Sequence, residues 1–139
     1  MTSRARVGIA LGFLLAVVVA WPFVRALYWR SHPEAAFSSV TGGQLPEGVS
    51  ATAYRGRVDD NLFHVTHYWL LSGEPQSIRA VVDSAPFARS DADARANLPD
   101  VAKLFGARRS ALAAGYEWEA PRSHWYYIFE GEAEALYAY

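Results

Sequence analysis

The sequence contains no cysteine. A disulfide framework, a thiolate metal site and a lipid-carrying cysteine are therefore excluded. Familiar catalytic motifs are missing as well. No serine stands in a G-x-S-x-G elbow, TGGQ at residues 41–44 is not a phosphate-binding loop, and Asp91, Asp93 and Asp100 lack the glycine and glutamate of a calcium loop. The motifs indicate no catalytic residue and no cofactor.

Acidic residues are absent from the first 30 positions, which hold Arg4, Arg6, Arg25 and Arg30 and carry a charge of +4. The other 9 of the 13 basic residues, together with all 14 acidic residues, give the rest of the chain a net charge of −5. A body of that sign does not attract a phosphate backbone. The charge distribution therefore argues against nucleic-acid binding.

An uncharged apolar run, VGIALGFLLAVVVAWPFV, extends from residue 7 to residue 24. Its 18 residues are about the minimum that spans ~30 Å of hydrocarbon as a helix. Trp21 and Trp29 cluster at its far end, where aromatic rings favour the headgroup level. The run predicts a single transmembrane helix, with residues 1–30 forming an anchor and a juxtamembrane segment.

The orientation of this helix follows from the short basic tail ahead of it. Arg4 and Arg6 favour an N-terminus inside the cytoplasm, in a plasma or inner membrane, with the rest of the chain outside. The alternative is a cleaved signal peptide that releases a secreted domain after Ala20. The apolar run passes through that position to Val24, which favours a retained anchor.

Residues 31–48 are rich in Ser, Gly, Pro and Ala and predict a linker, so the folded domain is expected at residues 49–139. Residues 49–58 and 62–72 are typical of strands. Ile78, Val81, Val82 and Ala85 have the spacing of an amphipathic helix. A second helix is expected from Pro99 to Leu112, with Gly115 near its C-cap, and SDADARAN before it is expected to be a polar connection.

Gly131 separates two strand-like runs at the end of the chain and predicts a hairpin turn at residues 130–131 or 131–132. Paired residues then have numbers that sum to 261 or 263. Both sums are odd, so even positions of the first strand share a face with odd positions of the second in either register. One predicted face comprises His124, Tyr126, Ile128, Ala133, Ala135, Tyr137 and Tyr139. The other comprises Trp125, Tyr127, Phe129, Glu132, Glu134 and Leu136.

These segments together predict an α+β fold of order ββααββ. One transmembrane helix is followed by a small antiparallel sheet that carries two helices on one face. The uncharged hairpin face is expected to be the core. The other face combines aromatic rings with two glutamates and is expected to be partly wet, which makes it a candidate partner surface. That surface comprises Trp125, Tyr127, Phe129, Glu132 and Glu134.

Histidines offer the alternative site. His64, His67 and His124, with a nearby carboxylate, could hold a zinc ion in a small hydrolase. On the predicted strand, however, His64 and His67 point to opposite faces, and apolar neighbours favour a hydrogen-bonded structural role for His67. No metal site is therefore predicted.

The expected function is a small membrane-tethered binding or accessory module that acts through protein contacts outside the cytoplasm. A domain of about 90 residues leaves little room for a deep catalytic cleft, which argues against an enzyme. The metal-dependent hydrolase and the secreted domain remain the alternatives.

Overall fold

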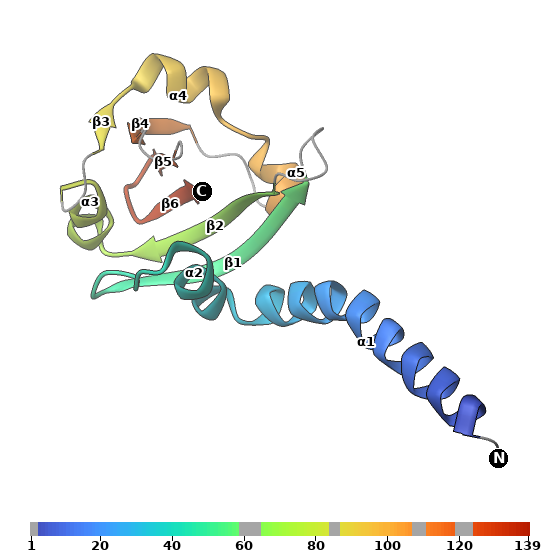
Figure 1. Ribbon diagram of the computed structural model, residues 1–139. Coiled ribbons are helices and arrows are strands. Elements are labelled where there is room, and N and C mark those ends of the chain that lie inside the picture. Colours follow the sequence, from blue (N-terminus) through green and yellow to red (C-terminus); the bar gives the residue numbers. More distant parts are fainter. Residues whose placement is uncertain (1–2, 59–64, 84–86, 107–110, 119–123) are drawn as a thin grey trace.

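The computed structural model describes residues 3–58, 65–83, 87–106, 111–118 and 124–139, with the backbone alone for residues 3–8 and 102 (Figure 1). An apolar N-terminal helix precedes a six-stranded antiparallel sheet and its helices, so the predicted α+β class is confirmed. The elements are α1 Ser3–Ser31, α2 Pro33–Thr41, β1 Val49–Val58, β2 Val65–Gly73, α3 Pro75–Asp83, β3 Ala88–Arg89, α4 Asp91–Asn97, α5 Val101–Phe105, β4 Leu112–Trp118, β5 His124–Phe129 and β6 Glu134–Ala138.

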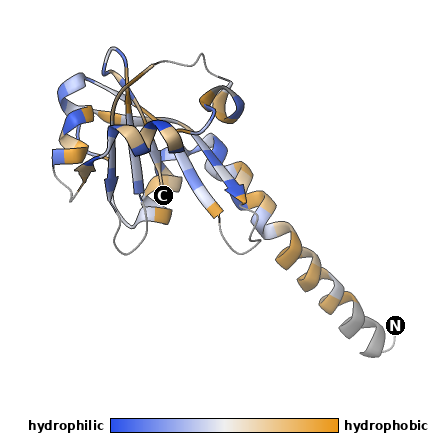
Figure 2. Cartoon of the chain, turned by 90° about the horizontal axis from the view of Figure 1, so that it is seen from above, coloured by the Kyte–Doolittle hydropathy of each residue, from blue (hydrophilic) through white to orange (hydrophobic). Residues whose placement is uncertain are grey.

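Helix α1 extends away from the sheet domain and is hydrophobic along most of its described length (Figure 2). Within Ile9–Ser31, an 18-residue window has a mean hydropathy of 2.1 and none of it is buried by the rest of the chain. By length and composition it is the one helix in the described residues that could cross a membrane. Pro22 lies inside α1 without ending it.

The segment expected to be an irregular linker differs from that expectation, because residues 33–41 form α2. Ala36 is fully buried and Phe37 packs against the sheet, so the helix gains apolar burial that its composition does not suggest. The indole Nε1–H of Trp69 donates a hydrogen bond to the carbonyl of Pro33 (3.1 Å). Gly42, with a φ of 72°, provides the left-handed residue after the helix.

The sheet has the strand order β1-β2-β6-β5-β4-β3. In the C-terminal hairpin, Tyr126 pairs with Tyr137 and Ile128 with Ala135, so paired numbers sum to 263, as in the second of the two predicted registers. Gly131 and Glu132 both have positive φ (88° and 56°). The predicted division into two faces is therefore confirmed for residues 125–128 and 135–138, whereas Ala133 is exposed in the turn and Glu132 is paired with Arg79 of α3.

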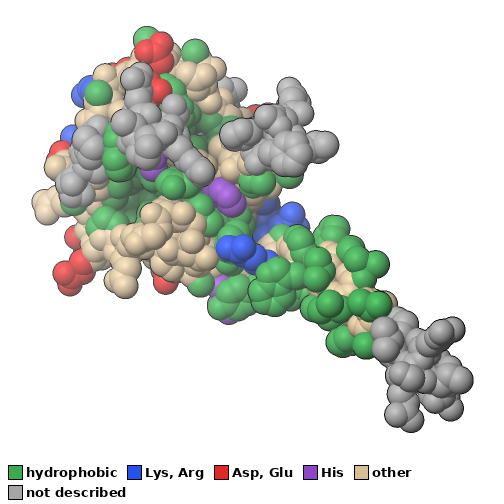
Figure 3. Space-filling view, viewed as in Figure 1, with side chains coloured by type: hydrophobic (Ala, Val, Ile, Leu, Met, Phe, Trp, Pro, Cys, Tyr) green, Lys and Arg blue, Asp and Glu red, His purple; other side chains and the backbone are tan. Residues whose placement is uncertain are grey.

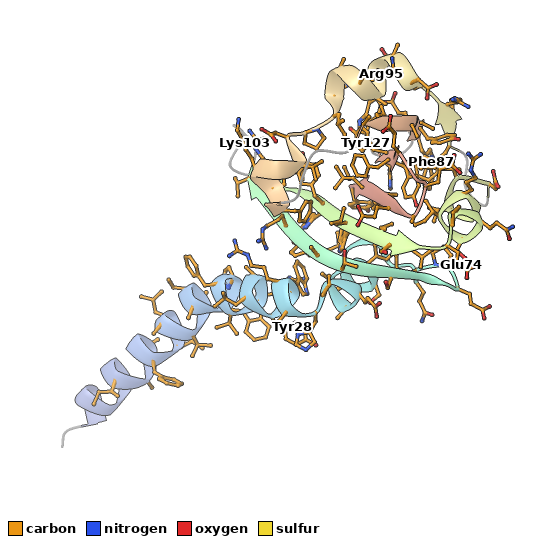
Figure 4. The ribbon with its side chains drawn as sticks, turned by 180° about the vertical axis from the view of Figure 1, so that it is seen from behind. Tyr28, Glu74, Phe87, Arg95, Lys103 and Tyr127 are labelled. Carbon is orange, nitrogen blue, oxygen red and sulfur yellow. The ribbon has the colours of Figure 1, made fainter. Side chains whose placement is uncertain are left out.

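Helices cover both faces of the sheet, which corrects the expectation that two helices share one face. Side chains of α2 and α3 pack with Tyr126, Ile128 and Tyr137 on one side, here called the α3 face. Residues of α4 and α5 pack with Tyr127 and Phe129 on the other side, the α4 face. Figure 4 shows side chains filling the space around Tyr127 on the α4 face.

The predicted first helix is confirmed as α3, in which Ile78 and Val82 are buried. The predicted second helix is wrong in extent, because α5 ends at Phe105 and Gly106 has a left-handed φ of 67°. Residues 112–118 form β4, which pairs with β5, and the polar connection forms α4. Part of the expected helix, residues 107–110, lies outside the described residues.

Candidate functional site

Two rows of mostly aromatic residues cross the α3 face. The pairing registers place one residue of each of β1, β2, β5 and β4 in each row, because directly paired residues share a face. Tyr137 of β6 completes the inner row, and Tyr139, just beyond β6, completes the outer row. The inner row is Tyr54, Trp69, Tyr137, Tyr126 and Tyr116. The outer row is Gly56, His67, Tyr139, His124 and Trp118, with reciprocal backbone hydrogen bonds between His67 and Tyr139.

Each histidine of the outer row is hydrogen-bonded to a tyrosine of the inner row on the neighbouring strand. The Nδ1 atom of His67 lies 2.7 Å from the hydroxyl of Tyr54, and the Nδ1 atom of His124 lies 2.7 Å from the hydroxyl of Tyr137. The prediction that His67 is a hydrogen-bonded structural histidine is confirmed. His124 is more deeply buried, with only 5% of its surface exposed.

The two tyrosines stay neutral at physiological pH. Burial raises the pKa of Tyr54 to about 12, although the nearby Arg25 and Arg30 act in the opposite direction. Burial also raises the pKa of Tyr137. Each phenol therefore keeps its proton and remains a stable hydrogen-bond partner for the histidine beside it.

The alternative zinc site at the histidines is not found in the described part of the chain. That part holds no cluster of three His, Cys, Asp or Glu residues suited to a metal ion. His67 and His124 lie in one row but are separated by strand β6. Their backbones are thus two strand spacings apart, about 9.6 Å. His64 lies outside the described residues.

A cleft of about 440 Å³ opens on the α3 face between α2, α3 and the sheet. The described residues that line it carry no charged side chain. They are Phe37, Thr41, Gly43, Gln44, Pro46, Val81, Phe87, Trp118, His124, Tyr137 and Tyr139. Its volume falls in the range of ligand pockets, about 300–1,000 Å³, and its apolar walls with a few polar groups are typical of them.

Ring contacts order the sheet side of this cleft. The imidazole of His124 stacks on Trp118, with 4.5 Å between ring centroids, and meets Tyr139 edge-on at 4.6 Å. Phe87 contacts Trp118 edge-on at 5.9 Å. Because His124 is held by its hydrogen bond and by two rings, the cleft has a fixed wall rather than a loose surface.

The predicted partner surface is largely covered, which corrects the expectation of a partly wet face. Tyr127 and Phe129 are only 1% and 3% exposed because α4 and α5 pack over them. Trp125 is half-buried and stacks on Tyr127, and Glu132 is paired with Arg79. Of the five predicted residues, Glu134 alone is exposed.

Sequence reasoning missed the cleft because one of its walls belongs to the expected linker. Phe37 and Thr41 lie on α2, and Gln44 follows it. A signal was present, since Ala36, Phe37 and Val40 have helical spacing and Pro33 is suited to a first turn.

Comparisons of the chain with protein-family models, with curated proteins and with solved structures find no significant match.

Proposed function

We propose that the chain is a membrane-tethered binding module, anchored by α1, whose sheet domain lies outside the cytoplasm and receives a protein partner in the α3-face cleft. The observation that carries this proposal is the contrast along α1. Its apolar side chains from Ile9 to Leu27 are exposed, whereas Trp29 packs against Tyr54 and His67 of the sheet. One helix thus offers a lipid-compatible surface and a fixed attachment to the domain.

The same helix argues against release of the domain by cleavage after Ala20. Trp21, Phe23 and Leu27 would remain on the released chain, and each is more than 60% exposed. Exposed apolar side chains in such density are unfavourable in water and are expected at a lipid interface. Retention of the whole helix in a membrane removes that cost.

A protein partner suits the chemistry of the cleft. Its described walls are aromatic and uncharged, and Thr41 and Gln44 place polar groups on the α2 side. Large aromatic side chains that surround a pocket are where interface energy concentrates. The cleft is therefore expected to take an apolar or aromatic side chain that the partner inserts.

The test combines photo-crosslinking with carbonate washing of membranes. A photo-reactive p-benzoylphenylalanine replaces Phe87 in the cleft of the full chain or, as the control, Trp125 on the α4 face. Irradiation of intact cells is expected to give a protein conjugate from position 87 and not from position 125. Both chains are expected to remain in the membranes after the carbonate wash. Adding the double substitution Leu14→Arg and Val18→Arg to either chain is expected to release it into the supernatant.

Two results would contradict the proposal. Recovery of the unmutated chain in the carbonate supernatant would rule out the anchor. Identical product patterns from positions 87 and 125 would rule out the cleft as the partner site.

A further inference from the structure

Two valines are exposed at the end of β1 and β2 where residues 59–64 join the two strands. Val58 is 56% exposed and Val65 is 44% exposed, and they are direct partners in the β1–β2 register. Among the large apolar residues that the structure describes as exposed, these are the two that lie outside α1. Single exposed apolar residues are ordinary, but these two are paired and adjoin the surface against which α1 packs.

This valine pair continues the surface on which α1 docks. Trp29 contacts Tyr54 and His67, with ring centroids 5.7 and 6.1 Å apart. Val58 and Val65 lie on the same face, because each is separated by an even number of strand positions from Tyr54 or His67. The pair thus forms the next row toward the adjoining ends of β1 and β2, about 7 Å beyond the row of Gly56 and His67.

These adjoining strand ends also lie on the membrane side of the domain if α1 is the anchor. Figure 1 places the end of β1 on the side of the domain from which α1 extends. Residues 59–64, which join the two strands, lie outside the described residues. If α1 is the anchor, the described ends of β1 and β2 therefore face the bilayer surface.

Arginines surround the same place. The guanidinium of Arg25 lies over the ring of Trp29, 4.0 Å from its centroid, and the side chain of Arg30, the next residue of α1, is exposed. Figure 3 shows basic side chains gathered where α1 meets the sheet domain, while most acidic side chains in that view lie away from this junction. Arg25 and Arg30 at the end of α1 supply the positive charge at this junction, whereas Asp59 and Asp60, which follow Val58 in the sequence, lie outside the described residues.

We propose that Val58 and Val65, with Arg25 and Arg30, form a second membrane contact that seats the adjoining ends of β1 and β2 in the phospholipid headgroup layer. The valines enter the boundary between headgroups and acyl chains, and the guanidinium groups bind lipid phosphates. A lipid surface is the occupant because the patch is continuous with the helix that leads into the bilayer. This inference rests on the proposed anchor and adds an orientation, in which the domain leans on the membrane and does not stand clear of it.

The test uses nitroxide labels on single cysteines in the full chain, which has no cysteine of its own. Labels are placed one at a time at Val58→Cys and Val65→Cys, with Ser50→Cys as the control, since Ser50 is exposed at the opposite end of β1. The chain is inserted into nanodiscs at one copy per disc, which removes contacts with a second copy. The lipids are phosphatidylcholine alone or an equal mixture with phosphatidylglycerol.

The measurement is the ratio of collision rates with oxygen, which concentrates in lipid, and with a water-soluble nickel chelate. We expect a several-fold higher ratio at positions 58 and 65 than at position 50, and a further rise with phosphatidylglycerol. Arg25→Gln with Arg30→Gln should reduce that rise. Equal ratios at positions 50, 58 and 65 in both lipids would overturn the inference.

A fourth label, at Leu14→Cys, separates this inference from the anchor on which it rests. A lipid-buried label at position 14 with water-exposed labels at 58 and 65 overturns the second contact and leaves the anchor intact. A water-exposed label at position 14 overturns the anchor, and the second contact with it.

Discussion

Neighbouring aromatic residues in β5 hold helices on opposite sides of the sheet. The hydroxyl of Tyr126 donates a hydrogen bond to the carbonyl of Ile78 in α3 (3.1 Å), and that of Tyr127 to the carbonyl of Asn97 at the end of α4 (3.3 Å). Burial raises the pKa of both phenols, so both remain donors at neutral pH. Each ring therefore contributes apolar burial and a specific attachment point.

The burial of Phe129 changes the loss of stability that is expected for Phe129→Ala. The sequence alone predicts a small loss of stability for Phe129→Ala, because the ring was expected to be half wet. Since Phe129 is 3% exposed beneath α4 and α5, we now expect a loss of about 3–5 kcal/mol, comparable with Tyr126→Ala. Trp125→Ala should cost less because Trp125 is half-buried.

Denaturant unfolding of the full chain in one detergent compares the three variants. The argument is contradicted if Phe129→Ala lowers the free energy of unfolding by as little as Trp125→Ala and by much less than Tyr126→Ala.

At the scale of elements, α4 lies against β4 at a position where there is no room for a side chain. A Cβ built on Gly115 would come within 2.0 Å of the Cβ of Ala94. The N–H of Gly115 also donates a hydrogen bond to the Asp91 carboxylate (2.9 Å), and this bond, with the adjacent Arg89, lowers the pKa of Asp91. A glycine that was expected near a helix end is thus the docking site of a different helix.

Gly115→Ala should therefore push α4 away from the sheet. We expect a loss of about 1–3 kcal/mol in the free energy of unfolding, the usual range for overpacking. Gly43→Ala is the matched control, because the nearest atom to its added Cβ is 3.7 Å away. Hydrogen exchange should show faster exchange in α4 for the first variant only. Unchanged exchange in both would mean that α4 accommodates the methyl group.

Elements with a strong intrinsic pattern could be predicted from the sequence, and elements created by tertiary contacts could not. The helical spacing of apolar residues predicted α3. The odd sum of paired residue numbers predicted which residues of the C-terminal hairpin share a face. Strand β4 has the sequence LAAGYEW, whose alanines and glycine have weak strand preference. Pairing with β5 and contact with Ala94 decide its state.

The cleft could not be predicted for the same reason. Phe37, which lines it, lies on α2, in a stretch whose composition alone indicates a linker.

At the scale of the whole molecule, helix α1 and the sheet domain form one continuous unit. Helix α1 ends at Ser31, His32 follows, and α2 begins at Pro33, so no flexible spacer separates them. A mobile linker would let the domain take many orientations relative to α1, whereas the short junction and the packing of Trp29 against Tyr54 favour one.

That rigidity leads to a prediction about distances between α1 and the sheet. Spin labels at Gly12→Cys in α1 and Ala113→Cys on the exposed side of β4 should give a narrow distance distribution by pulsed electron resonance of the reconstituted chain. Trp29→Ala should broaden it, because the ring packs between α1 and the first two strands. Trp21→Ala should leave it narrow, since that ring is 62% exposed on the same helix. A distribution that is equally broad in all three chains would mean that the domain swings freely at Ser31, and neither the cleft nor the adjoining ends of β1 and β2 would then keep a fixed position relative to the membrane.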